Sequence, residues 1–295
     1  MLVAEHEPDV EVEVAAAEWA PRRPPASTRA PHAIVFVDGV RRLEARAWID
    51  IGNDDAVPGI FASYAAGAVR CDGQATVERV MVGRGLFAPA RDLADVVTRH
   101  GTFVACRTKD AAPESINYAM HERMTECEVQ IAEAARGSGD ELLVLDGPLR
   151  KGQHIRDAVG LVKTHHVRYL PEACNRVVGE LAPGERTPIF RIDARPFSRH
   201  AWYIRLPGPP GGPWAGVVRA EASGTLPPAD VRDLADSVTL ALPRFASLPH
   251  KDARAPQNLA PIGALERLLR HRLGDARVCY RALRVASGTR TVSTP

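Results

Sequence analysis

The chain has 295 residues, with 38 lysines and arginines against 36 aspartates and glutamates, which gives a formal net charge of +2. Apolar residues make up 45% of it and charged residues 25%, a globular composition that excludes global disorder and collagen-like structure. No apolar stretch approaches the ~20 residues that cross a bilayer, and the acidic start lacks the basic and apolar regions of a signal peptide. We therefore expect a soluble, cytoplasmic protein without a membrane partner.

The basic residues and the cysteines are unevenly used. Only four of the 38 basic residues are lysines: Lys109, Lys151, Lys163 and Lys251. A GC-rich coding sequence explains this bias, although guanidinium groups also suit phosphate better than ammonium groups do. The five cysteines are odd in number and show no zinc or disulfide spacing, so we expect them to be reduced and mostly buried.

The N-terminal residues 1–31 have the composition of a tail. An acidic, alternating stretch is followed by a linker rich in proline and arginine. We expect partial disorder here, with at most one short edge strand at Val10–Val14. Residues 32–285 are predicted to form a single domain, and residues 286–295 a frayed C-terminus.

The first strong element is the apolar run Ala33–Asp38, which Asp38-Gly39 is expected to end. Such a run is typical of a strand buried on both faces. Further strands are predicted at Leu43–Ile51, Ala68–Cys71 and Thr76–Val82. The glycines between these runs favour a meander over βαβ units.

Helices and strands alternate after the meander. A short helix is predicted at 91–100, a strand at Thr102–Cys106 and a long helix from about Ser115 to Arg136. Later strands are predicted at Glu141–Leu145, Ala158–Lys163, Thr187–Ile192, Ala201–Leu206 and Ala215–Ala220, and later helices at 227–242 and Pro261–Leu273. This order resembles a ribonuclease H-like α/β fold, in which a mixed sheet is flanked by helices, with additional α/β elements toward the C-terminus.

Two apolar strands end alike, in Asp38-Gly39 and in Asp146-Gly147. If these strands lie side by side, their carboxylates share one edge of the sheet and can reach a common hard cation such as Mg²⁺ or Mn²⁺. The alternative interpretation is that each Asp-Gly pair merely begins a turn.

The long helix offers a third carboxylate. Its apolar stripe includes Met124 and Ile131, and Glu128 lies at the edge of that stripe, where an unpaired carboxylate is unfavourable. Glu128 is therefore the better candidate ligand, with Glu126 as the alternative. Glu128 could also extend to solvent or pair with an arginine.

Several of these motifs together resemble the NurA nucleases. Asp38-Gly39 after an apolar strand, a helical glutamate, Leu145-Asp146-Gly147-Pro148-Leu149 and a strand-end lysine at Lys163 follow that family's order over roughly residues 33–285. The resemblance implies a ribonuclease H-like fold and a DNA nuclease that uses Mn²⁺ or Mg²⁺ in double-strand-break end processing. It also implies a homodimer that works beside a HerA-type hexameric translocase.

The resemblance also assigns roles to residues. Asp38, Glu128 (or Glu126) and Asp146 would hold two metal ions, and Lys163 would lie near the scissile phosphate. Two positions depart from the family: Val40 stands where a serine is usual, and the segment Ala255–Ile262 lacks the usual metal-binding histidine. Candidate substitutes for that histidine are Asn258, Gln257, His250 and Asp252.

The segment 147–205 contains 11 basic and 5 acidic residues, a local excess of +6. It could form a track for the DNA backbone, to which Arg150, Lys151, Arg156 and Arg168 would contribute, or simply a solvated charged face. Nearby aromatic residues could stack on bases or pack in the core: Trp202, Tyr203 and Trp214. One of the adjacent residues His165 and His166 could assist proton transfer.

Three functions are thus open. The first is a metal-dependent DNA nuclease of the NurA type. The second is a catalytically weak module of the same fold that binds DNA or a translocase, which the missing histidine favours. The third is a ribonuclease H-like enzyme that acts on RNA or hybrid duplexes.

Overall fold

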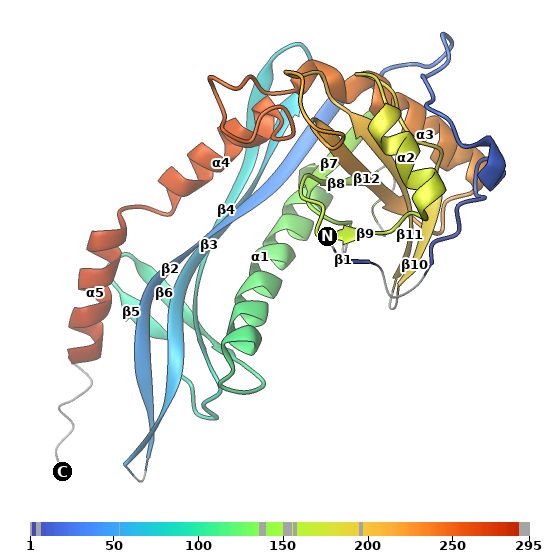
Figure 1. Ribbon diagram of the computed structural model, residues 1–295. Helices are drawn as coiled ribbons and strands as arrows, with labels where there is room; N and C mark the ends of the chain where they lie inside the picture. Colours follow the sequence, from blue (N-terminus) through green and yellow to red (C-terminus); the bar gives the residue numbers. More distant parts are fainter. Residues whose placement is uncertain are drawn as a thin grey trace. The chain divides into compact units, whose positions relative to one another are not determined.

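The computed structural model describes residues 2–3, 7–52, 54–135, 140–149, 155, 158–194 and 197–288. It is a mixed α/β fold with a large mixed sheet flanked by helices, as expected (Figure 1). The chain forms two compact units: the first contains Met1–Val37, Val69–Val77 and Ala132–Ala264, and the second contains Asp38–Ala68, Glu78–Ile131 and Leu265–Pro295.

The first unit is built on strands that include the most apolar runs of the sequence. Across the sheet they follow the order β10 (Phe190–Ala194), β11 (Phe197–Arg205), β12 (Val217–Ser223), β8 (Ala158–Val162), β7 (Glu141–Asp146) and the start of β2 (Ala33–Gly52). β2, β7 and β8 are parallel neighbours, whereas β8, β12, β11 and β10 pair antiparallel. Burial of both faces explains why the parallel strands are apolar throughout.

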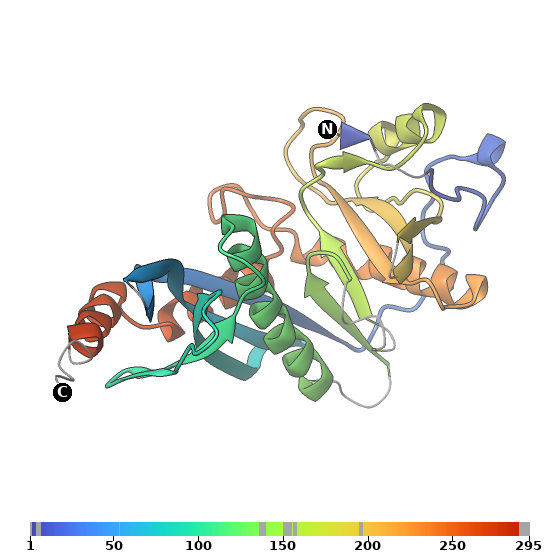
Figure 2. The same cartoon turned by 90° about the horizontal axis from the view of Figure 1, so that it is seen from below.

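Helices cover both faces of the antiparallel strands in this unit. Helix α2 (Glu172–Glu180) and helix α3 (Pro228–Ala241) lie on opposite sides of β10–β12 (Figure 2). Side chains alternate along β11, so Tyr203 packs with the α2 residues Cys174 and Val178 while its neighbour Trp202 points to the other face. Sequence reasoning did not predict α2.

The N-terminal segment contacts the first unit at several points. β1 (Leu2–Val3) pairs parallel with β9 (Val167–Arg168), and single bridges join Asp9 to Arg191 and Arg22 to Arg186. A short 3₁₀ helix, η1, spans Ala16–Glu18. The strand expected at Val10–Val14 is not formed; instead the Trp19 indole N–H donates to the Val10 carbonyl oxygen and Arg186 donates to the Glu13 carboxylate.

The second unit contains the longest strands. Their order is β2, β3 (Asp55–Cys71), β4 (Ala75–Ala88), β6 (Gly101–Arg107) and β5 (Val96–Thr98). The meander β2–β3–β4 was expected, but β2 is one strand of 20 residues where two were predicted. The helix expected at 91–100 is also wrong, because that segment forms a turn and β5.

Helices pack on the second unit through apolar stripes. α1 (Pro113–Ala135) buries the predicted stripe, including Met120, Met124 and Ile131. α4 (Ala260–Arg272) is followed by 3₁₀-like turns and by α5 (Ala276–Gly288), a separate helix that was not predicted (Figure 1). The α5 residues Cys279 and Leu283 pack against β3, β4 and β6 in one apolar cluster.

Two further expectations can be compared with the structure. All five cysteines are free and buried, as predicted. Among the helices of the described ranges, none has the length and apolar character needed to cross a membrane.

Candidate metal centre

The parallel pairing of β2 with β7 brings together the ends of the two apolar runs. Val37 lies opposite Leu145, and the next residues along the two strands are Asp38 and Asp146. β7 ends there because Gly147 has φ +103°, a conformation that residues with a side chain rarely adopt. The expectation that the two Asp-Gly strands lie side by side is therefore confirmed.

Asp38 itself lies in the second unit, where Glu128 of α1 approaches the same stretch of β2. The Asp38 side chain is only 5% exposed, and its Oδ1 accepts a hydrogen bond from the Gly39 N–H at 2.7 Å. A Cβ atom placed on Gly39 would lie 2.4 Å from Oε1 of Glu128, so the carboxylate occupies the space that a side chain at position 39 would fill. Glu128 thus lies against Gly39, on the face of the strand opposite the Asp38 side chain, because successive side chains of a strand alternate between its two faces.

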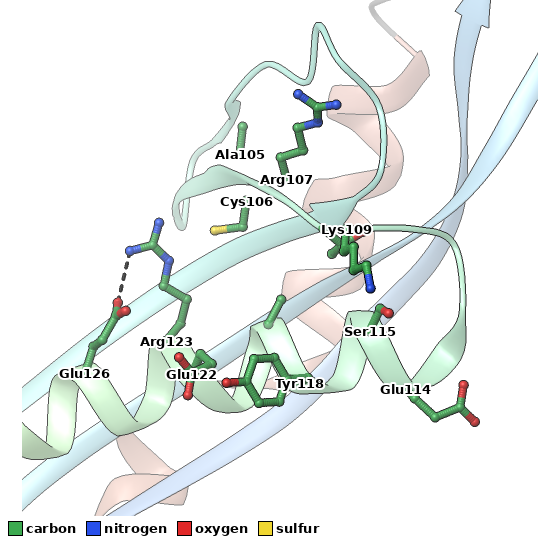
Figure 3. A pocket seen from close by; sticks show the side chains of 12 residues that line it. Ala105, Cys106, Arg107, Lys109, Glu114, Ser115, Tyr118, Glu122, Arg123 and Glu126 are labelled. Atoms are coloured by element: carbon green, nitrogen blue, oxygen red, sulfur yellow. Dashed lines mark hydrogen bonds and ion pairs between the residues drawn. The ribbon is translucent and has the colours of Figure 1, made fainter. Parts of the chain in front are cut away.

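Glu126 points elsewhere. Its carboxylate forms an ion pair with Arg123 at 3.1 Å, and its side chain is 42% exposed. Figure 3 shows this pair at the side of a hollow of about 690 Å³ between α1 and β6, lined also by Cys106, Tyr118 and Glu122. Burial raises the pKa of the Cys106 thiol, so the thiol stays protonated at neutral pH. Glu128, not Glu126, is therefore the helical glutamate that lies against β2, at Gly39.

Glu266 on α4 is a carboxylate that the sequence analysis missed. One of its oxygens lies within 4.8 Å of a carboxylate oxygen of Asp38. Glu266 adjoins the buried positions Ile262, Leu265 and Leu269 of its helix. The same reasoning that selected Glu128, an acid at the edge of an apolar stripe, would have selected Glu266 as well.

Asp38, Asp146 and Glu266 are the residues in the described ranges that could together hold a metal ion. All three offer carboxylate oxygens, the donors that Mg²⁺ and Mn²⁺ prefer. The donor set therefore fits a hard divalent cation. Glu128, which occupies the space beside Gly39, is not among these residues, so its prediction as a metal ligand is not supported.

Lys163 directly follows the buried strand β8 and reaches Asp146. Its Nζ lies 2.7 Å from each carboxylate oxygen of Asp146 and 2.7 Å from Oδ1 of Asn258. Asn258 is fully buried, and its Nδ2 donates to Oδ2 of Asp252 at 2.6 Å. Burial raises the pKa of Asp252, but hydrogen bonds from the Arg254 N–H and from Asn258, together with the charges of Arg254 and Lys163, bring that pKa below its usual value.

These contacts define the role of Asn258 in this cluster. Its amide oxygen accepts a hydrogen bond from Lys163, and its amide nitrogen donates to Asp252. The same amide oxygen was a candidate metal ligand in the sequence. His250, another candidate, is exposed.

The remaining site candidates lie in different surroundings. Arg150, Lys151 and Arg156 are outside the described residues, and Arg168 is half-buried in β9. Trp202 and Tyr203 are fully buried, so they serve the core and not base stacking.

His165 is held within the first unit. Its Nε2 lies 3.0 Å from the Val217 carbonyl oxygen, and its ring packs against Trp214 and Tyr203. Burial lowers the pKa of His165, so the ring is neutral at pH 7. These contacts give His165 a packing role.

Comparison with models of known protein families gives no match for this chain, and comparison with curated proteins gives none either.

Proposed function

We propose that this protein is a metal-dependent nuclease that hydrolyses phosphodiester bonds in DNA. In this proposal Asp38, Asp146 and Glu266 hold a divalent cation, Mn²⁺ or Mg²⁺, and Glu128 of α1 packs against β2 at Gly39, next to Asp38 in the strand. The observation that carries the proposal is the register of β2 against β7, which makes Asp38 and Asp146 the residues that follow one paired position. Each of these two carboxylates directly follows a run of buried apolar strand residues.

The residues of the chain suit this reaction in charge and in position. A bound divalent cation would activate water and stabilise the departing oxygen of a phosphodiester. The Lys163 ammonium lies against Asp146, where it can offset negative charge that develops on the non-bridging phosphate oxygens. Burial of Asp38 limits access of water and strengthens its electrostatic interactions.

The order of these residues supports a finer assignment. Asp38, a helical Glu128, Asp146 and a strand-end Lys163 follow the pattern of the NurA nucleases. On that basis we propose a role in DNA double-strand-break end processing in the cytoplasm, as a homodimer beside a HerA-type translocase. Glu266 and the Asn258 contact with Lys163 are features of this chain that the resemblance did not include.

One observation favours a second candidate, a catalytically weak module that binds DNA or a translocase. The segment Ala255–Ile262 has no histidine, and the Asn258 oxygen accepts a hydrogen bond from Lys163. A protein that binds DNA in EDTA and does not cleave it in Mn²⁺ would fit this candidate and contradict the first.

The decisive experiment compares cleavage of labelled linear DNA by the wild type and by Asp146→Asn in Mn²⁺. We expect the variant to lose at least a hundredfold in rate, because a neutral amide both weakens the cation site and releases the Lys163 ion pair. Asp193→Asn is the matched control, since Asp193 is an exposed residue paired only locally with Arg191. Equal residual activity in the wild type and Asp146→Asn would indicate a contaminating nuclease and refute the proposal.

A further inference from the structure

We propose that the Lys163 ammonium takes the place of a second divalent cation at Asp146, and that Asn258 and Asp252 are positioning residues that hold it there. The acidic site then binds one divalent cation per chain, not the pair that the sequence resemblance implies. This inference rests on the proposed function, because it concerns the cation that the nuclease would use. It differs from that function in predicting how many ions bind.

The argument begins with the contacts of the ammonium. Nζ of Lys163 lies 2.7 Å from both carboxylate oxygens of Asp146, which is the position that a cation chelated by this carboxylate would occupy. Charge-assisted contacts of this length are among the stronger ones in proteins. Lys163 therefore covers one side of the Asp146 carboxylate with a positive charge that belongs to the chain itself.

The Asn258 side chain also binds the Lys163 ammonium. An ammonium group has three donors, and one of them goes to Oδ1 of the fully buried Asn258 at 2.7 Å. Because Nδ2 of Asn258 donates to Asp252, the amide cannot turn its nitrogen toward Lys163 without losing that bond. Asp252 thus sets the direction of the Asn258 amide, and the amide sets the position of the lysine.

The backbone gives Lys163 little freedom to leave. Lys163 follows Val162, the last residue of β8, and β8 is buried throughout between β7 and β12. The lysine side chain is 13% exposed and the Asp146 side chain 18% exposed. A second divalent cation at Asp146 would have to displace a positive charge that three oxygens already hold.

Titration with MnCl₂, followed by calorimetry on the metal-free full-length chain, tests the number of ions. We expect one Mn²⁺ per wild-type chain and two per chain in Lys163→Met, which keeps the length of the side chain and removes its charge. Lys109→Met is the control for the loss of one positive charge, because Lys109 is an exposed loop residue of the second unit, and it should bind one Mn²⁺. Two Mn²⁺ in the wild type, none in the wild type, or an unchanged single Mn²⁺ in Lys163→Met would overturn the inference.

The positioning role has a spectroscopic test. With only four lysines in the chain, the ¹H–¹⁵N signal of a held ammonium can be assigned by substitution. We expect one slowly exchanging ammonium signal in the wild type, its absence in Lys163→Met, and at least tenfold faster exchange in Asn258→Ala. Asp252→Ala, a change at a half-buried turn residue, should accelerate exchange as well and serves if Asn258→Ala does not fold. A wild-type signal unaffected by Asp252→Ala would contradict the positioning role.

The outcomes separate this inference from the proposed function. One bound Mn²⁺ with no DNA cleavage would refute the nuclease and leave the role of Lys163 intact. Two bound Mn²⁺ with cleavage that depends on Asp146 would refute the role of Lys163 and leave the nuclease intact.

Discussion

At the scale of single residues, Gly39 makes room for a carboxylate of α1 against strand β2. It follows Asp38 in β2, and the space above its Cα holds the Glu128 carboxylate. Gly39 does not have a positive φ, so alanine could adopt its backbone conformation. What excludes a larger residue at this position is the space that its side chain would need. The glycine of this Asp-Gly pair therefore makes room for a side chain, whereas Gly147 of the other pair allows the chain to turn.

Gly39→Ala should therefore damage the site without breaking the strand. The added methyl group would force the Glu128 carboxylate aside, and we expect a loss of about 1–3 kcal/mol in the free energy of unfolding. Mn²⁺-dependent cleavage should fall about 10- to 100-fold, as it does when a supporting residue of a metal site is lost. Gly212→Ala, where nothing lies within 4 Å of the new Cβ, should change neither quantity. Normal cleavage by Gly39→Ala would exclude a role for Glu128.

At the scale of elements, the N-terminal segment is attached to the first unit through a buried ionic network. Arg186, with a side chain 1% exposed, donates to both carboxylate oxygens of Glu13 and to Asp236 of α3. The Ile189 N–H also donates to Glu13. Burial by itself would raise the pKa of Glu13, but these hydrogen bonds and the charges of Arg186 and Arg22 lower that pKa below its usual value.

A lowered pKa in the folded state means that Glu13 stabilises the fold above its unfolded pKa, near 4.5, and that this stabilisation is lost as the pH falls through the folded pKa. Glu13→Gln should lower the free energy of unfolding at pH 7 by about 3 kcal/mol, because it leaves Arg186 buried with one fewer charged partner. Urea denaturation at pH 7, 5, 4 and 3 should show a smaller acid-induced loss in the variant. Glu7→Gln, at an exposed position, is the control. Parallel pH profiles for the wild type and Glu13→Gln would show that Glu13 contributes nothing to acid sensitivity.

The elements also show where local sequence signals are ambiguous. Asp38-Gly39 and Asp146-Gly147 carry the same local signal, but only the second ends a strand. β7 pairs with β2 only as far as Val37, and β2 continues past Asp38-Gly39 as a neighbour of β3. The turn signal at Asp38-Gly39 thus yields to the pairing of β2 within the sheet, because tertiary context overrides local preference in strands.

At the scale of the whole molecule, the positive excess of segment 147–205 is largely used within the protein. Arg186 is buried against Glu13 and Asp236, and Arg199 lies 3.3 Å from the buried Glu221. Arg191 pairs with Asp193, and Arg205 donates to backbone carbonyls. The predicted DNA track therefore has fewer groups available than the charge count suggests, and its predicted members are Arg150, Lys151, Arg156 and Arg168.

Phosphate contacts from the four predicted members of the track would give DNA binding a modest salt dependence. Each neutralised phosphate contributes about −0.9 to the slope of log affinity against log salt concentration. Binding to a duplex through four contacts should therefore give a slope of about −3 to −4, whereas six contacts, the full excess of +6, would give about −5. Fluorescence anisotropy in EDTA between 50 and 200 mM salt would measure it. Arg168→Ala should reduce the magnitude of the slope by about 1. Binding that does not change with salt would refute an electrostatic DNA track.

The sequence by itself determined the α/β class, most of the strands, the apolar stripe of α1 and two of the three candidate metal ligands. Those features depend on periodicity and on strand ends, which are local. Tertiary structure alone left Glu128 out of the acidic group, added Glu266 and joined Lys163 to Asn258, 95 residues away. The reason is physical: a side chain's partner depends on how helices and strands distant in the chain pack together, and local pattern carries no record of that packing.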